Sequence, residues 1–257
     1  MSGTPGSNLS LPQALALVRD HRAAGRLREA EQVLRAVVAA QPQDASTRFA
    51  LANLLKVDGR ADEADAAYRA VLEIDPNHVG AINNLGNVLK SQGRLDEAIE
   101  CYRQALSLQP ELPNALNNLG NALKRKGEVQ EAIESYRQAL KLDPEFAEAH
   151  FNFANALAQD GQLDQAAAAY GEVTRLRPDH AAAYKSLAAV HYEQGRFAEA
   201  ADAVARALAH TANDVQAMRL QGRCLRRLGR SEEAVTIYEK VIELAPNDPM
   251  AHNDLGV

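Results

Sequence analysis

Hydrophobic and polar positions alternate along the chain with the spacing of amphipathic helices. In the stretch LDEAIECYRQAL, apolar side chains stand at Leu95, Ala98, Ile99, Tyr102 and Ala105, which share one helix face, with Asp, Glu, Arg and Gln between them. Runs of this kind recur throughout the chain, and each is bounded by glycine or proline. The pattern predicts a succession of short helices, each with one buried and one solvated face.

The pattern itself repeats every 34 residues. AINNLGNVLK at 81–90 returns as ALNNLGNALK at 115–124. A constant period of this length is typical of stacked helical units, because one unit is too small to bury its own apolar face. Residues 1–10 are expected to form a flexible leader, and a partial eighth repeat is expected at 249–257. The seven full repeats are predicted at 11–44, 45–78, 79–112, 113–146, 147–180, 181–214 and 215–248.

Three positions define the structure of each repeat, counted from its first residue. Position 15 is always glycine, which ends a helix with a left-handed residue. Position 20 is always alanine, which lets two helices approach closely. Position 32 is proline in every repeat but the sixth, which has Ala212, and proline stops the second helix. Each repeat is therefore predicted to be a helix, a tight turn, a second helix and a bend.

These residues resemble the motif of the tetratricopeptide repeat family over residues 11–257. The small residue at position 8 and the aromatic residue at position 24 (Tyr68, Tyr102, Tyr136, Tyr170 and Tyr238) also match, whereas the family's tryptophan at position 4 is missing. The first repeat departs most, with Val18 and Leu34 at positions 8 and 24. The resemblance implies an all-α fold, a right-handed superhelix of antiparallel helix pairs, in which the first helix of each repeat lines a concave groove.

Asparagines cluster at positions of the first helix that the resemblance places in or near this groove. Because positions 6 and 9 are three residues apart, they share one face of a helix. An amide offers both a donor and an acceptor, as a peptide backbone does, so a ladder of amides can hold an extended peptide by its main chain. The alternative is that the amides only bridge neighbouring helices. The candidate residues are Asn83 and Asn117 at position 5, Asn84, Asn118 and Asn152 at position 6, and Asn53, Asn87, Asn121 and Asn155 at position 9.

Cationic residues accompany the amides. Lys56, Lys90 and Lys124 occupy position 12 of three successive repeats, and Arg219, Arg223 and Arg226 lie on the first helix of the seventh, next to Arg227. Because arginine suits oxyanions, these residues favour an acidic or phosphorylated protein or peptide partner. Ion pairs with neighbouring helices are the alternative. The net charge of −6 gives no reason to expect nucleic acid.

No catalytic, metal-binding or cofactor motif stands out, so we expect neither an enzyme nor a metal or cofactor site in this chain. No apolar run reaches the roughly 20 residues that span a bilayer, which indicates no membrane contact. Cys101 and Cys224 belong to no CxxC pair and are interpreted as reduced thiols of a cytoplasmic protein.

Two functions remain open from the sequence. The chain is either an adaptor that binds peptide segments, or the substrate-recognition arm of a longer bacterial enzyme that is truncated in this sequence. The asparagine ladder resembles that of O-linked N-acetylglucosamine transferases, so the enzyme would be a glycosyltransferase of that type or a sulfotransferase. For the adaptor, homo-oligomerisation through the convex face is a further alternative.

Overall fold

The computed structural model describes residues 11–246 together with residue 253. The expected leader at 1–10 and all but one residue of the expected partial repeat at 249–257 lie outside this range. The chain divides into two compact units, Met1–Gly127 and Glu128–Val257. The border between them falls at the turn inside the fourth repeat.

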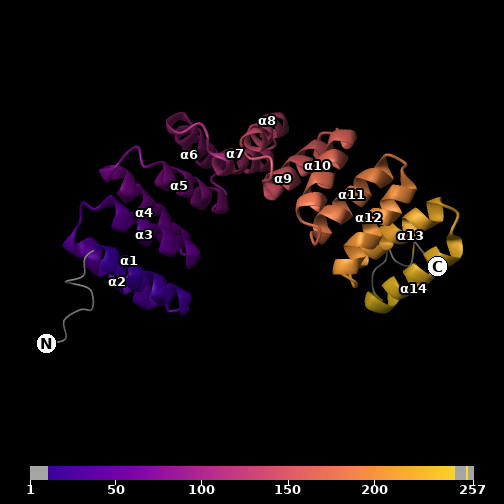
Figure 1. The fold of residues 1–257 in the computed structure, drawn as a ribbon, viewed down its shortest axis with the longest axis horizontal. Helices are drawn as coiled ribbons and strands as arrows, with labels where there is room; N and C mark the ends of the chain where they lie inside the picture. The colour runs from indigo at the N-terminus through magenta and orange to yellow at the C-terminus, as the bar shows by residue number, and fades with distance from the viewer. Residues whose placement is uncertain (1–10, 247–252, 254–257) are drawn as a thin grey trace. The chain divides into compact units, whose positions relative to one another are not determined.

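The described residues form fourteen helices and no strand, which confirms the predicted all-α class. The N-terminal unit contains α1 (Leu11–Ala23), α2 (Leu27–Ala40), α3 (Ala45–Val57), α4 (Ala61–Ile74), α5 (Val79–Ser91), α6 (Leu95–Leu108) and α7 (Pro113–Lys126). The C-terminal unit contains α8 (Val129–Leu142), α9 (Ala147–Gln159), α10 (Leu163–Leu176), α11 (Ala181–Glu193), α12 (Phe197–His210), α13 (Val215–Arg227) and α14 (Ser231–Leu244) (Figure 1).

Within each unit, every helix packs against the next one along the chain. First helices of neighbouring repeats also contact each other, as α3 does α5, α5 does α7 and α11 does α13. Each unit therefore has a layer of first helices and a layer of second helices. In each unit taken by itself, we call the solvent-facing surface of the first helices that carries positions 6, 9 and 12 the first-helix face.

The helices end where the glycines at position 15 and the prolines at position 32 predict. All seven position-15 glycines have positive φ, and Gly127 ends α7 in the left-handed conformation at φ 94°. A Cβ atom at Gly127 would meet nothing within 4 Å, so the backbone conformation requires glycine there, and lack of space does not. The sixth repeat shows that proline is not essential at position 32. Helix α12 ends at His210, the same position as in the other repeats, although Ala212 replaces the proline.

The core of each repeat is built from small residues and a tyrosine. The position-20 alanines are at most 2% exposed, and Tyr68, Tyr102 and Tyr136 are fully buried. In the third repeat the Tyr102 ring lies so close to Gly86 that a Cβ atom at Gly86 would stand 2.7 Å from Cε1. This close approach brings the tyrosine hydroxyl to the first helix of its own repeat.

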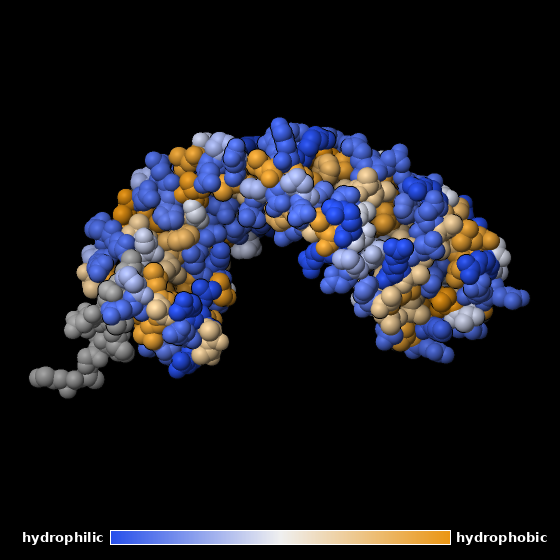
Figure 2. All heavy atoms as spheres, in the orientation of Figure 1, coloured by the Kyte–Doolittle hydropathy of each residue, from blue (hydrophilic) through white to orange (hydrophobic). Residues whose placement is uncertain are grey.

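The second helices of the N-terminal unit carry a network of ion pairs between repeats. Arg60, just before α4, donates to Glu31 of the preceding repeat at 2.6 Å and to Glu63 of α4 at 2.6 and 2.7 Å. Arg94 repeats this pattern one repeat later, with Asp65 at 2.6 Å. On the face shown in Figure 2, hydrophilic residues cover most of the surface and hydrophobic residues appear in separate patches.

Candidate functional site

The asparagines at position 9 are held by the buried tyrosines at position 24. For three of the four, the tyrosine hydroxyl donates to the amide oxygen of an asparagine fifteen residues earlier. The three bonds are Tyr68 to Asn53 at 2.7 Å, Tyr102 to Asn87 at 2.8 Å and Tyr170 to Asn155 at 2.6 Å. Burial raises the pKa of all three tyrosines, so their hydroxyls keep the proton that they donate.

This bond fixes the direction of each amide. With the oxygen turned to the tyrosine, the amide nitrogen is left as the outward-facing donor of a half-buried side chain. Among the described residues, nothing accepts a hydrogen bond from the amide nitrogen of Asn53, Asn87 or Asn155. The first-helix face therefore carries oriented N–H donors that have no acceptor among the described residues.

The asparagines at position 6 link neighbouring repeats. Asn84 donates to the Asn53 oxygen at 2.9 Å and accepts from the Lys56 ammonium at 3.2 Å. One repeat later, Lys90 donates to Asn118 at 3.1 Å. Asn84 therefore bridges neighbouring helices, which is the alternative that the sequence left open, because both of its polar atoms already have partners. The Asn84 side chain is half-buried and stands on the same helix face as the position-9 donor Asn87.

Position 5 differs from positions 6 and 9. Asn117 is buried, with 3% of its surface exposed, and the amide oxygen of Asn83 is enclosed and makes no hydrogen bond within the described chain. A ligand therefore finds little of the Asn117 side chain, whereas Asn83 is half-buried and its place in the ligand site stays a prediction.

Lys56 and Lys124 are half-buried cations on the same face. Burial lowers the pKa of both ammonium groups. Neither lysine forms an ion pair with a carboxylate of the described residues. A cation that has lost part of its water without gaining a counter-charge favours an anionic ligand.

In the C-terminal unit, Asn152 and Asn155 lie half-buried on α9, and α13 carries the predicted arginines. Arg219 is half-buried, whereas Arg223 and Arg226 are exposed. The Arg223 guanidinium lies over the Tyr192 ring of α11, 4.5 Å from its centroid. The aromatic partner was not predicted, because it belongs to the preceding repeat.

The tyrosine partners of the asparagines were also missed, although the sequence holds a signal for them. Asparagine occupies position 9 in the second to fifth repeats, and each of these has tyrosine at position 24. The sixth repeat has Ala189 with Val204, and the first has Arg19 with Leu34. Asparagine therefore occurs only where a tyrosine can bind it.

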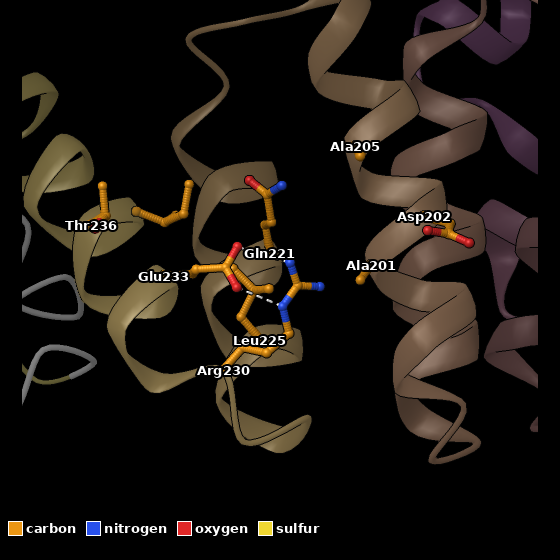
Figure 3. A pocket seen from close by; sticks show the side chains of 9 residues that line it. Ala201, Asp202, Ala205, Gln221, Leu225, Arg230, Glu233 and Thr236 are labelled. Carbon is orange, nitrogen blue, oxygen red and sulfur yellow. Dashed lines mark hydrogen bonds and ion pairs between the residues drawn. The ribbon is translucent and has the colours of Figure 1, made fainter.

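A separate pocket of about 350 Å³ lies among α12, α13 and α14 (Figure 3). Its charged centre is Arg230, which forms two bonds to Glu233 at 2.7 and 2.8 Å. Ala201 stands where Glu31 and Asp65 stand in earlier repeats, so the cross-repeat acid is missing and a space remains. Because Arg230 already has its carboxylate, this pocket does not identify a ligand.

The described residues contain no group of three or more His, Cys, Asp or Glu side chains placed to hold a metal ion. None of the described helices is long and apolar enough to cross a membrane. Cys101 and Cys224 are free thiols. What the first-helix face offers chemically is a set of oriented amides and cations, which suits binding of polar main chains and anionic groups.

Comparison with known proteins shows which families have similar sequences. A family model described as the C-terminal domain of cilia and flagella-associated protein 70 matches residues 77–256, and a tetratricopeptide repeat model matches residues 15–79. No curated protein matches the chain.

Solved structures are similar over most of the chain. YrrB, described as a tetratricopeptide repeat protein with an unusual peptide-binding site, is 25% identical, with 74% of this chain and 97% of YrrB covered and a TM-score of 0.63. MamA is 26% identical, with 65% and 97% covered and a TM-score of 0.60. A tetratricopeptide repeat protein from Parabacteroides merdae shares the fold at 18% identity, with 95% and 96% covered and a TM-score of 0.67.

Proposed function

Because the chain belongs to the tetratricopeptide repeat family, we propose that it is a protein-interaction module that binds an extended peptide segment on its first-helix face. The observation that carries this proposal is the tyrosine-fixed amide: Asn53, Asn87 and Asn155 each turn an unengaged N–H₂ group outward. Asn53 and Asn87 lie in the N-terminal unit and Asn155 in the C-terminal unit. Within each unit, peptide carbonyl oxygens are acceptors that fit these donors.

The spacing of the row agrees with an extended peptide. Packed helices lie roughly 10 Å apart, and an extended strand rises roughly 3.3 Å per residue. One repeat therefore serves about three ligand residues, and contacts to the main chain leave most of the peptide sequence unspecified. The half-buried Lys56 and Lys124 add a preference for acidic side chains. That YrrB is described as having a peptide-binding site supports the same role.

Peptide selection on the immobilised full-length chain tests the proposal, with dissociation constants then measured by fluorescence anisotropy. The combined change Asn53→Ala, Asn87→Ala and Asn155→Ala is expected to weaken binding without loss of helicity in circular dichroism. Each lost amide removes a polar contact, worth roughly 0.5–1.5 kcal/mol, so a loss of about tenfold or more is expected for the triple variant.

A charge test uses Lys56→Gln with Lys124→Gln. This double variant is expected to lose affinity for acidic peptides and to keep its affinity for neutral ones. The matched control is Lys126→Gln with Lys141→Gln, which changes the net charge equally at exposed positions. Unchanged affinity in the triple asparagine variant would contradict the amide ladder, and equal losses in the two lysine variants would contradict a specific role for the buried lysines.

A further inference from the structure

A second pocket, of about 360 Å³, opens between α11 and α13 of the C-terminal unit. Its aromatic walls are Tyr192 at the end of α11 and Phe197 at the start of α12, whose ring centroids are 5.3 Å apart. Arg223 and Arg227, one helical turn apart on α13, also line it, as does Glu193. We call these five residues the Arg–aromatic pocket.

Both guanidinium groups lie against aromatic rings. The Arg223 group is 4.5 Å from the Tyr192 centroid, and the Arg227 group is 4.6 Å from the Phe197 centroid. Stacking on a ring occupies the flat face of a guanidinium and leaves its in-plane N–H donors free. Within the described chain, neither arginine forms an ion pair. Two donor forks are therefore oriented before any ligand arrives.

The charge around the pocket favours an anion. Helix α13 carries four arginines and neither Asp nor Glu. The exposed carboxylate of Glu193 opposes an anion, but Arg223 and Arg227 outnumber it at the pocket itself. One carboxylate has two oxygens and is satisfied by one fork, whereas a phosphate monoester has three acceptor oxygens and a charge near −2, which two forks can share.

We propose that the Arg–aromatic pocket binds a phosphorylated side chain of the partner. The inference rests on the proposed function in one respect, because it places this side chain on a segment that lies along the first-helix face. The aromatic walls then contact the carbon atoms of the side chain, so that the phosphate alone is not the whole ligand.

Small blocked amino acids test the pocket without any peptide. The full-length ¹⁵N-labelled chain is titrated with N-acetyl-O-phosphoserine methylamide, the corresponding glutamate and serine compounds, and inorganic phosphate. Arginine side-chain N–H signals and α13 amide signals are followed. We expect saturable shifts with phosphoserine, at least about tenfold weaker binding of glutamate, none with serine, and weaker binding of inorganic phosphate.

Two sets of variants identify the site. Arg223→Gln with Arg227→Gln is expected to abolish the phosphoserine shifts. The control Arg137→Gln with Arg175→Gln removes the same charge at exposed arginines that pair with Glu134 and Glu172, and is expected to keep them. Tyr192→Leu with Phe197→Leu retains both charges but not the stacking, and is expected to weaken binding severalfold.

The opposing carboxylate supplies an additional test. Because Glu193→Gln removes the opposing charge, it is expected to tighten phosphoserine binding, and circular dichroism verifies that every variant is folded. Equal affinity for phosphoserine and glutamate, or for phosphoserine and inorganic phosphate, would overturn the inference, as would loss in the Arg137 and Arg175 control. Binding of the small phosphoserine compound without selected peptides would instead leave the pocket valid and reject the peptide role.

Discussion

Removing the hydroxyl of Tyr102 tests the bond that orients the asparagine row. Tyr102→Phe deletes the 2.8 Å hydrogen bond to Asn87 and leaves the fully buried ring in place. Because Asn87 is half-buried, water can replace part of the lost interaction, and the expected loss in the free energy of unfolding is about 1 kcal/mol. Truncation to alanine would instead leave a cavity and cost roughly 3–5 kcal/mol.

The assay is urea unfolding followed by circular dichroism, with Tyr184→Phe as the matched control. Tyr184 has no hydrogen bond from its hydroxyl within the described chain, so the same chemical change there should have little effect. The freed Asn87 amide can then rotate, so affinity for a selected peptide should fall in Tyr102→Phe and not in Tyr184→Phe. Equal stability and equal affinity in the two variants would refute the orienting role of the bond.

Tyr102 also affects how the stability of the chain changes at alkaline pH. Burial raises the pKa of Tyr102 above its ordinary value of 10, so the unfolded chain releases the phenolic proton at a lower pH than the folded chain does. The stabilisation that comes from this difference in pKa between the folded and the unfolded chain is fully present below pH 10. It is lost as the pH rises above 10. Tyr102→Phe should therefore show a shallower loss of stability above pH 10 than the unchanged chain.

Three further predictions concern positions away from this row. Hydrogen bonds from Arg60 hold the pKa of Glu63 below its ordinary value of 4.5. The stability that these bonds contribute is present above pH 4.5 and is lost as the pH falls through the lowered pKa. In urea unfolding measured at several pH values, Arg60→Gln should therefore lose less stability in acid than the unchanged chain does. His180 accepts the backbone N–H of Ala183 at 3.1 Å at the start of α11, so His180→Ala should cost about 1 kcal/mol in urea unfolding and His180→Asp, the residue found at the start of α13, should cost less. Burial raises the pKa of the Cys101 and Cys224 thiols to about 11, so iodoacetamide at pH 8 should label the folded chain far more slowly than the urea-unfolded chain, and equal rates would contradict the burial.

Much of the fold could be predicted because each local signal agrees with the repeat. The first helices begin at the first residue of each predicted repeat, from Leu11 to Val215, because glycine and proline act on the backbone of their own neighbourhood. Ala212 shows the limit of that reasoning. The helix before it, α12, ends at the same position without proline and packs against α13 of the next repeat.

The site was harder to predict because its bonds join residues far apart in the sequence. The three-residue spacing of positions 6 and 9 placed asparagines on one face of each first helix, but it does not tell which amide atom, of Asn53 for example, faces inward. That depends on Tyr68, fifteen residues from Asn53 in the second helix. The Arg–aromatic pocket joins two successive repeats, so no single repeat contains its pattern.

The central claim is that a peptide lies on the first-helix face. Hydrogen–deuterium exchange of the full-length chain, with and without a selected peptide at saturation, tests it most directly. The account predicts that exchange slows at the exposed backbone amides of α3, α5 and α7 or of α9, α11 and α13, and stays unchanged in the second helices. Protection confined to the second helices, such as α4, α6 and α12, would contradict it.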